Sequence, residues 1–175
     1  RHEPMLGATT DVASKFASRK TTKMVDGVAV TDYFASDFTL AEIKTLRAIQ
    51  TRGRDTAYDG QFEIPTLDEV ITLAKTQSAL LGRPIGIYPE VKHSTFHDGL
   101  FGARAFENLL VDKLHAAYGN SSAAPVFIQS FEVNNLQYLN TRTDIKLVQL
   151  VDADDVKPDG SMSLVAPFAQ PYDFV

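Results

Sequence analysis

The chain has 175 residues, of which 44% are apolar and 22% charged, a composition typical of a folded globular domain. Its net charge is −5 with lysine and arginine scattered along the sequence, which argues against a nucleic-acid partner and against binding to an anionic membrane surface. Cysteine is absent, which excludes disulfides and thiol chemistry, and the apolar runs are too short to span a membrane.

The first segment of the chain is polar. Arg1 to Leu6 is interpreted as the end of a strand that runs into a loop, with His2 and Glu3 side by side at its edge. Histidine is the side chain best matched to proton transfer near neutral pH, and the alternative for His2 is an exposed histidine without a role. Residues 12–35 show no sustained periodicity, and the basic run from Ser18 to Lys23 favours a solvated loop.

Two helices are expected next, each opening with a capping box. Thr39-Leu40-Ala41-Glu42 begins the first, and Thr66-Leu67-Asp68-Glu69 begins the second, which should end near Gly82. Between them, Thr51 to Gly60 has the glycines and charges of an exposed loop. Apolar residues at helical spacing support both helices: Leu40, Ile43, Leu46 and Ile49 in the first, and Leu67, Val70, Ile71 and Ala74 in the second.

Ile85 to Lys92 combines β-branched residues with two charges at its end, and it predicts a buried parallel strand. Glu90 and Lys92 are two residues apart, so their side chains should share a face. A carboxylate and an ammonium at the carboxyl end of such a strand lie where α/β barrels hold their chemistry. The alternative is a surface ion pair. His93 to Gly99 is expected to form a loop, solvated or facing a substrate, and its two histidines are a weak indication of metal binding.

The rest of the chain alternates helices and strands. A long helix with a core stripe is followed by a second buried strand, a short helix, a third strand and an acidic turn. The expected ranges are helix 101–118, strand 125–132, helix 134–139, strand 145–151 and turn 152–160, with no firm element from Met162 onward. The stripe of the long helix consists of Phe106, Leu109, Leu110, Leu114 and Ala117, which leaves His115 on the surface.

This alternation favours a parallel sheet with crossover helices, in the α/β class. Glycine-rich phosphate loops do not follow any of the three strands, which argues against Rossmann and P-loop proteins. A (β/α)8 barrel usually requires about 250 residues. The sequence therefore predicts either a small open sheet or part of a barrel.

Several motifs resemble, in the same order, those of the glycerophosphodiester phosphodiesterase family. The stretch IGIYPEVK at Ile85 to Lys92 resembles its metal-ligand strand, and His2-Glu3 followed by Thr9-Thr10-Asp11 resembles its second histidine motif. The other matching stretches are Asp37 to Leu46, Ile64 to Glu69, Phe127 to Glu132 with Asn135-Leu136, and Lys146 to Val151.

The resemblance implies a TIM (β/α)8 barrel of the phosphodiesterase type, present here as a partial barrel. Residues 1–175 would run from the end of the third strand to just past the sixth, with residues 12–62 as an insert after the third strand. The family's first histidine-arginine pair and its acidic pair would lie upstream of this stretch.

The implied chemistry is metal-dependent hydrolysis of a small-molecule glycerophosphodiester to glycerol 3-phosphate and an alcohol. By resemblance, Glu90 is a ligand of Ca²⁺ or Mg²⁺, Lys92 contacts the phosphate, and His2 is the catalytic acid and base. Glu3, Gln129 and Phe131 would contact the substrate. The family also suggests a periplasmic or secreted protein, while the head group and the oligomeric state stay open.

Two other functions remain possible. A phospholipase D-like lyase on the same barrel would use similar groups and form a cyclic phosphate, but the lyase forms lack the long insert. A non-catalytic binding module derived from the barrel is the second, and the presence of Glu90, Lys92 and His2 argues against it.

Overall fold

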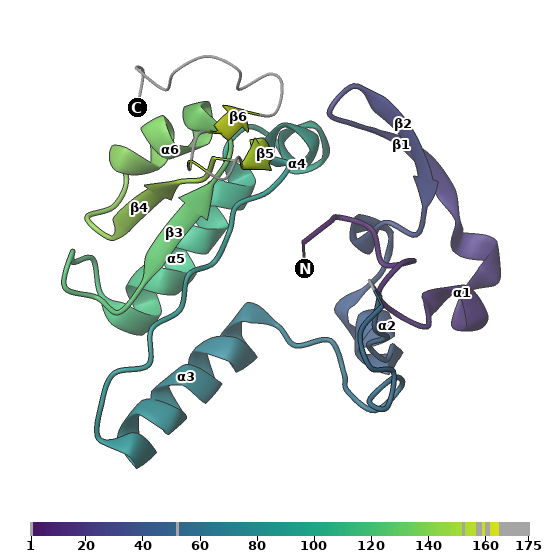
Figure 1. Cartoon of the computed structure of the whole chain (residues 1–175), viewed down its shortest axis with the longest axis horizontal. Helices are drawn as coiled ribbons and strands as arrows, with labels where there is room; N and C mark the ends of the chain where they lie inside the picture. Colours follow the sequence, from purple (N-terminus) through teal and green to yellow (C-terminus); the bar gives the residue numbers. More distant parts are fainter. Residues whose placement is uncertain (1, 52, 152, 157–158, 160–161, 165–175) are drawn as a thin grey trace. The chain divides into compact units, whose positions relative to one another are not determined.

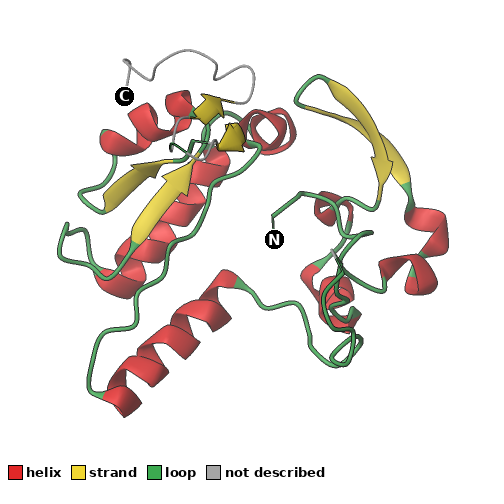
Figure 2. Ribbon diagram, in the orientation of Figure 1, coloured by secondary structure: helices red, strands yellow, loops and turns green. Residues whose placement is uncertain are grey.

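The computed structural model describes residues 2–51, 53–151, 153–156, 159 and 162–164 (Figure 1). It is a mixed α/β chain, as expected (Figure 2). The chain divides into two compact units, Arg1–Leu73 and Ala74–Val175. The region expected to be an insert, residues 12–62, lies within the first unit. The boundary between the units falls inside helix α3, Leu67–Leu81.

A β-hairpin occupies part of the stretch for which no element was expected. Strand β1, Thr21–Val25, pairs antiparallel with β2, Val28–Asp32, so the prediction of a solvated loop through Lys23 is wrong for its second half. Asp26 and Gly27 have φ angles of 48° and 82°. A two-residue type I′ turn requires positive φ at both central residues, and its twist matches that of the two strands it joins. Asp-Gly is a common sequence for this turn.

Short helices surround this hairpin. Helix α1, Val12–Lys15, and the 3₁₀ turns η1, Ala17–Arg19, and η2, Ala35–Asp37, precede α2, Leu40–Thr45. The capping box of α2 is confirmed, because Thr39 Oγ1 accepts a hydrogen bond from Glu42 N and Thr39 N donates to Glu42 Oε2. The helix ends earlier than the apolar spacing predicted, and Leu46 is extended.

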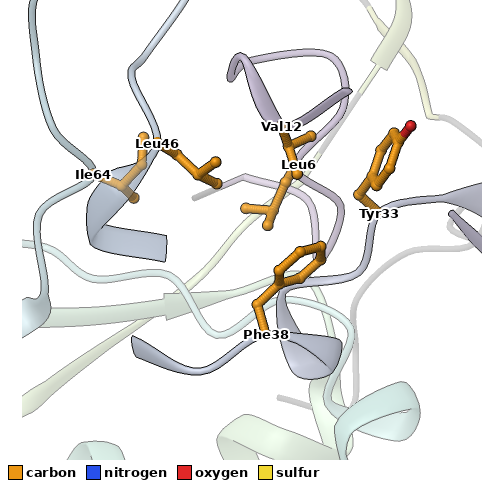
Figure 3. Close-up of a cluster of buried hydrophobic side chains, with 6 residues drawn as sticks. All are labelled: Leu6, Val12, Tyr33, Phe38, Leu46 and Ile64. Carbon is orange, nitrogen blue, oxygen red and sulfur yellow. The ribbon is translucent and has the colours of Figure 1, made fainter. Parts of the chain in front are cut away.

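The core of the first unit is a cluster of six buried side chains (Figure 3): Leu6, Val12, Tyr33, Phe38, Leu46 and Ile64. Leu6, Val12 and Leu46 are fully buried. Burial of one such aliphatic side chain stabilises the fold by about 1.5–3 kcal/mol. The cluster therefore anchors the segment that begins with His2, since Leu6 N also donates to Tyr33 O at 2.8 Å.

Helix α3 has the predicted start. Thr66 N donates to Glu69 Oε2 at 2.7 Å, and Glu69 N donates to Thr66 Oγ1 at 3.2 Å, which completes the second capping box. Gly82 follows the helix with φ of 63°, in the left-handed region where glycine is favoured after a helix end.

The second unit contains the predicted parallel strand pair. Strand β3, Phe127–Ser130, pairs with β4, Lys146–Gln149, in register from Phe127 beside Lys146 to Ser130 beside Gln149. Helix α6, Val133–Asn140, connects the two strands. Both strands and this helix confirm the sequence prediction.

The segment 85–92 lies parallel to β3 but does not form a continuous strand. Two isolated parallel bridges join this segment to the neighbouring chain. Glu90 pairs with Gln129 of β3, and Ile87 pairs with Val126, which precedes β3. Pro89 lies between them and has no N–H to donate, so one rung of the ladder is missing. Its carbonyl still accepts from Gln129 N at 3.0 Å, and Val91 N donates to Gln129 O at 2.9 Å.

The prediction of a loop at His93 to Gly99 is wrong, because Ser94–Phe101 forms helix α4. The helix expected from Phe101 begins later, as α5, Ala105–Tyr118, after a reversal at Gly102 and Arg104. Leu110, Val111 and Leu114 of α5 are buried, whereas Leu109 is exposed and does not belong to the core stripe. His115 is half-buried rather than on the surface, and its Nε2 lies 2.8 Å from Thr143 Oγ1.

A short antiparallel pair follows β4. Strand β5, Ala153–Val156, pairs with β6, Met162–Leu164, so the predictions of a simple turn and of no element at Met162 are wrong for these residues. The Lys157-Pro158 part of the expected turn and the tail from residue 165 lie outside the described residues. The strands of the described residues form three two-stranded sheets and no closed barrel. None of the described helices is long and apolar enough to cross a bilayer.

Candidate active site

Four of the six predicted site residues meet at the carboxyl end of β3. Glu90 forms a parallel bridge with Gln129, and the Gln129 side chain donates to Tyr88 O at 3.1 Å. Lys92 Nζ lies 3.9 Å from Glu90 Oε1 and 5.3 Å from the centre of the Phe131 ring. The segment 85–92 and β3 thus bring a carboxylate, an ammonium, an amide and an aromatic ring to one end of the sheet.

The ion pair of Glu90 and Lys92 is partly buried. Their side chains are 21% and 22% exposed. The separation of 3.9 Å is too long for a direct hydrogen bond, and Glu90 Oε1 is buried without a hydrogen-bond partner. A buried carboxylate oxygen without a hydrogen bond is costly unless a further group satisfies it.

This oxygen fits a hard divalent cation, which prefers carboxylate ligands. Among the described residues, no group of three or more histidine, cysteine or carboxylate side chains could hold a metal ion. The described residues thus offer the Glu90 carboxylate alone at this place, and its role as a metal ligand stays a prediction.

Glu132, two residues after the end of β3, holds the residue that begins α4 close behind Lys92. Glu132 Oε1 accepts from Ser94 N at 2.7 Å, and Glu132 Oε2 accepts from Ser94 Oγ at 2.5 Å. We call this pair of contacts the Ser94–Glu132 clamp. It also places a negative charge at the N-terminus of α4, where the helix dipole favours it.

Ser130 and Gln149 also form hydrogen bonds that join the segments at the carboxyl ends of the strands. The buried Ser130 hydroxyl donates to Val91 O at 2.9 Å and accepts from Glu132 N at 3.0 Å. Gln149 Nε2, from the end of β4, donates to Phe131 O at 3.0 Å and Leu150 O at 2.9 Å. The sequence prediction missed Ser94, Glu132, Ser130 and Gln149 as parts of the site. Their only local signal is that Ser130, Glu132 and Gln149 are polar residues at the ends of buried strands.

His97 packs inside the α4–α5 corner and is not exposed on a loop. Its ring stacks on Phe106 with 4.2 Å between the ring centres, and its Nδ1 is buried without a hydrogen-bond partner. Burial lowers the pKa of His97 below its ordinary value of 6.5, and the neighbouring His93 lowers this pKa further. The neutral imidazole is therefore favoured at neutral pH.

The other two predicted site residues, His2 and Glu3, belong to the first unit. His2 Nδ1 lies 2.5 Å from Glu3 Oε1, and both side chains are about half exposed. His2 lines a cavity of about 250 Å³ together with Thr9, Ile49, Gln50, Thr51 and Arg54. His2 is exposed, as the alternative for it expects, but its imidazole has a carboxylate partner and lines this cavity. Its catalytic role stays a prediction.

Each unit thus carries its own pair of acidic and basic side chains, His2 with Glu3 in the first and Lys92 with Glu90 in the second. In a comparison with known proteins, a model of the glycerophosphoryl diester phosphodiesterase family matches residues 1–175. The chain is 38% identical over 165 residues to the Arabidopsis thaliana protein named glycerophosphodiester phosphodiesterase GDPD6, covering 86% of this chain and 43% of that protein.

Two bacterial proteins named glycerophosphodiester phosphodiesterase are also similar. The Haemophilus influenzae protein is 31% identical over 175 residues, covering 89% of this chain and 45% of its own length, and the Treponema pallidum protein is 29% identical over 169 residues, covering 86% and 45%. The chain therefore belongs to the glycerophosphoryl diester phosphodiesterase family. It spans less than half the length of these relatives.

Proposed function

We propose that the full-length protein hydrolyses glycerophosphodiesters to glycerol 3-phosphate and an alcohol, with the help of a divalent cation. The observation that carries this proposal is the buried Glu90 oxygen without a hydrogen bond, placed 3.9 Å from the Lys92 ammonium in a member of this family. We further propose that the second unit forms part of a (β/α)8 barrel, whose functional groups collect at the carboxyl ends of the strands.

In this proposal Glu90 holds the cation, either Ca²⁺ or Mg²⁺. When bound, such a cation polarises a phosphoryl oxygen and stabilises the charge that develops on it. Lys92 contributes a second positive charge for the phosphate oxygens, and the Phe131 ring limits the directions in which its ammonium can turn. Gln129 and Phe131 line the glycerol side of the substrate.

His2 donates the proton that the leaving alcohol requires. A water oxygen adds to phosphorus, the bond from phosphorus to the alcohol oxygen breaks, and the proton of His2 passes to that oxygen. One proton of the water stays on the new phosphate monoester, and the other is released to solvent, from which His2 is reprotonated. Glu3 accepts a hydrogen bond from Nδ1 of the protonated imidazole, which orients the ring and leaves the proton on Nε2 for transfer.

The proposal is tested with Glu90→Gln in the full-length protein, and Glu63→Gln at an exposed glutamate of the first unit is the matched control. We expect Glu90→Gln to weaken binding of the metal, measured by calorimetry, and to abolish the release of glycerol 3-phosphate, while Glu63→Gln changes neither. Unchanged metal affinity in Glu90→Gln would reject the ligand role. A cyclic phosphate product, visible by phosphorus NMR, would favour the lyase instead.

A further inference from the structure

The cavity beside His2 has a consistent chemical character. Its described lining consists of the His2 imidazole, the side chains of Thr9, Gln50 and Thr51, the aliphatic Ile49, and the guanidinium of Arg54. None of these lining residues carries a carboxylate, and none is phenylalanine, tyrosine or tryptophan. Hydrogen-bond donors dominate, since arginine alone provides five N–H groups and no acceptor.

The loop that carries Arg54 is joined to the segment that carries His2. Ile49 N donates to Thr9 O at 3.0 Å, and Thr10 forms an antiparallel bridge with Ala48. The loop closes on itself, because Gly60 N donates to Ala48 O at 2.9 Å and Gln50 N donates to Asp59 Oδ1 at 2.6 Å. These bonds explain how Arg54, distant from His2 in sequence, comes to line the same cavity.

The size of the cavity restricts its occupant. One water molecule takes about 30 Å³ in the liquid, so a volume of about 250 Å³ suits a small polar group and is too small for acyl chains. A group rich in acceptor oxygens would satisfy the donors of the lining. A quaternary ammonium offers no acceptor and would be repelled by Arg54. The described lining also has no carboxylate and none of the Trp, Tyr or Phe rings that recognise such cations.

We propose that Arg54 is a specificity-determining residue that binds the oxygen atoms of the leaving alcohol, so that polyol or anionic head groups are favoured over choline. This inference rests on the proposed function, because the role of His2 as the acid places the leaving alcohol in this cavity. The substrate class is therefore glycerophosphodiesters of glycerol, inositol or a similar polyol.

The test compares hydrolysis of glycerophosphoglycerol and glycerophosphocholine by the full-length protein, and both reactions are followed by the same product, glycerol 3-phosphate. We expect the wild-type kcat/KM to be higher for glycerophosphoglycerol. Arg54→Gln should lower that value by about ten- to a hundredfold, the usual effect of losing hydrogen bonds from a charged group, and change the value for glycerophosphocholine by less than about twofold. Arg83→Gln, at an exposed arginine of the second unit, is the matched control and should alter neither substrate.

The same measurements distinguish failure of the Arg54 role from failure of the proposed hydrolase function. Equal losses on both substrates, no loss on either, or a wild-type preference for choline would overturn the role of Arg54 while glycerol 3-phosphate release still supports the hydrolase. If the wild-type protein releases no glycerol 3-phosphate from either substrate, the proposed function fails and the inference fails with it. Thermal unfolding of Arg54→Gln should match the wild type, because the side chain is exposed.

Discussion

Removal of the Ser94–Glu132 clamp should damage both the stability of the second unit and its chemistry. Glu132→Ala takes away the acceptor for two donors, Ser94 N and Ser94 Oγ. Ser94 itself is only 4% exposed. Water cannot easily replace the carboxylate there. The substitution also frees the N-terminus of α4, which begins two residues after Lys92.

The magnitude follows from the two lost bonds. A hydrogen bond to a charged group contributes about 1.5–3 kcal/mol, and two bonds to one side chain are not additive. Because Glu132 is only partly buried, we expect Glu132→Ala to lower the free energy of unfolding by about 2–4 kcal/mol. Glu132→Gln retains an acceptor oxygen for Ser94 N and a donor for Ser94 Oγ, so its cost should be about 1 kcal/mol.

Urea denaturation of the full-length protein measures these changes, provided that the slope m stays constant. Thr143→Val is the matched control. Thr143 is 8% exposed, and its hydroxyl contacts His115 Nε2 at 2.8 Å and Asn120 Oδ1 at 3.1 Å. It lies before β4, at the opposite end of the parallel pair from Glu132, so its loss should cost about 1–3 kcal/mol without affecting catalysis.

Kinetics at a temperature where all variants are folded separate positioning from stability. Glu132→Ala should lower kcat/KM, Glu132→Gln should recover most of it, and Thr143→Val should match the wild type. A change in unfolding free energy below about 0.5 kcal/mol for Glu132→Ala, within the range of ordinary surface substitutions, would refute the clamp. Equal catalytic losses in Glu132→Ala and Thr143→Val would refute its positioning role.

Three further predictions concern His2, the insert and His97. His2→Ala should slow diesters with poor leaving groups by about 10²–10⁴-fold and an activated aryl ester much less, and equal losses on both would leave only a binding role. Deletion of residues 51–60 should allow intact phospholipids to be hydrolysed alongside deacylated substrates, and an unchanged preference would make the insert a structural appendage. Because the pKa of His97 is lowered in the folded state, the unfolded chain binds more protons below pH 6.5, so stability should fall as the pH decreases through this range. His97→Phe keeps a ring against Phe106 and should show a weaker loss, measured by urea denaturation at a series of pH values; parallel curves for both proteins would contradict this assignment.

Local patterns determined the elements that are stabilised by neighbours in sequence. Both capping boxes formed as expected, because the threonine and the glutamate that satisfy the first N–H groups lie within one turn of each other. The hairpin could also have been predicted, since Asp26-Gly27 is a strong turn signal between two runs rich in β-branched residues. The two continuous apolar runs predicted strands β3 and β4, and the short segment between these runs predicted helix α6.

Tertiary contacts decided what no local pattern could indicate. Leu109 follows the helical period of the core stripe, but it is exposed in the folded chain. Helix α4 replaced the expected loop because its first N–H binds Glu132, 38 residues further along the chain. The sequence placed Glu90 and Lys92 on one face, but their burial and the missing hydrogen bond of Glu90 became visible only in the folded unit. Desolvation of a charged group depends on all atoms that surround it, and most of these come from distant parts of the chain.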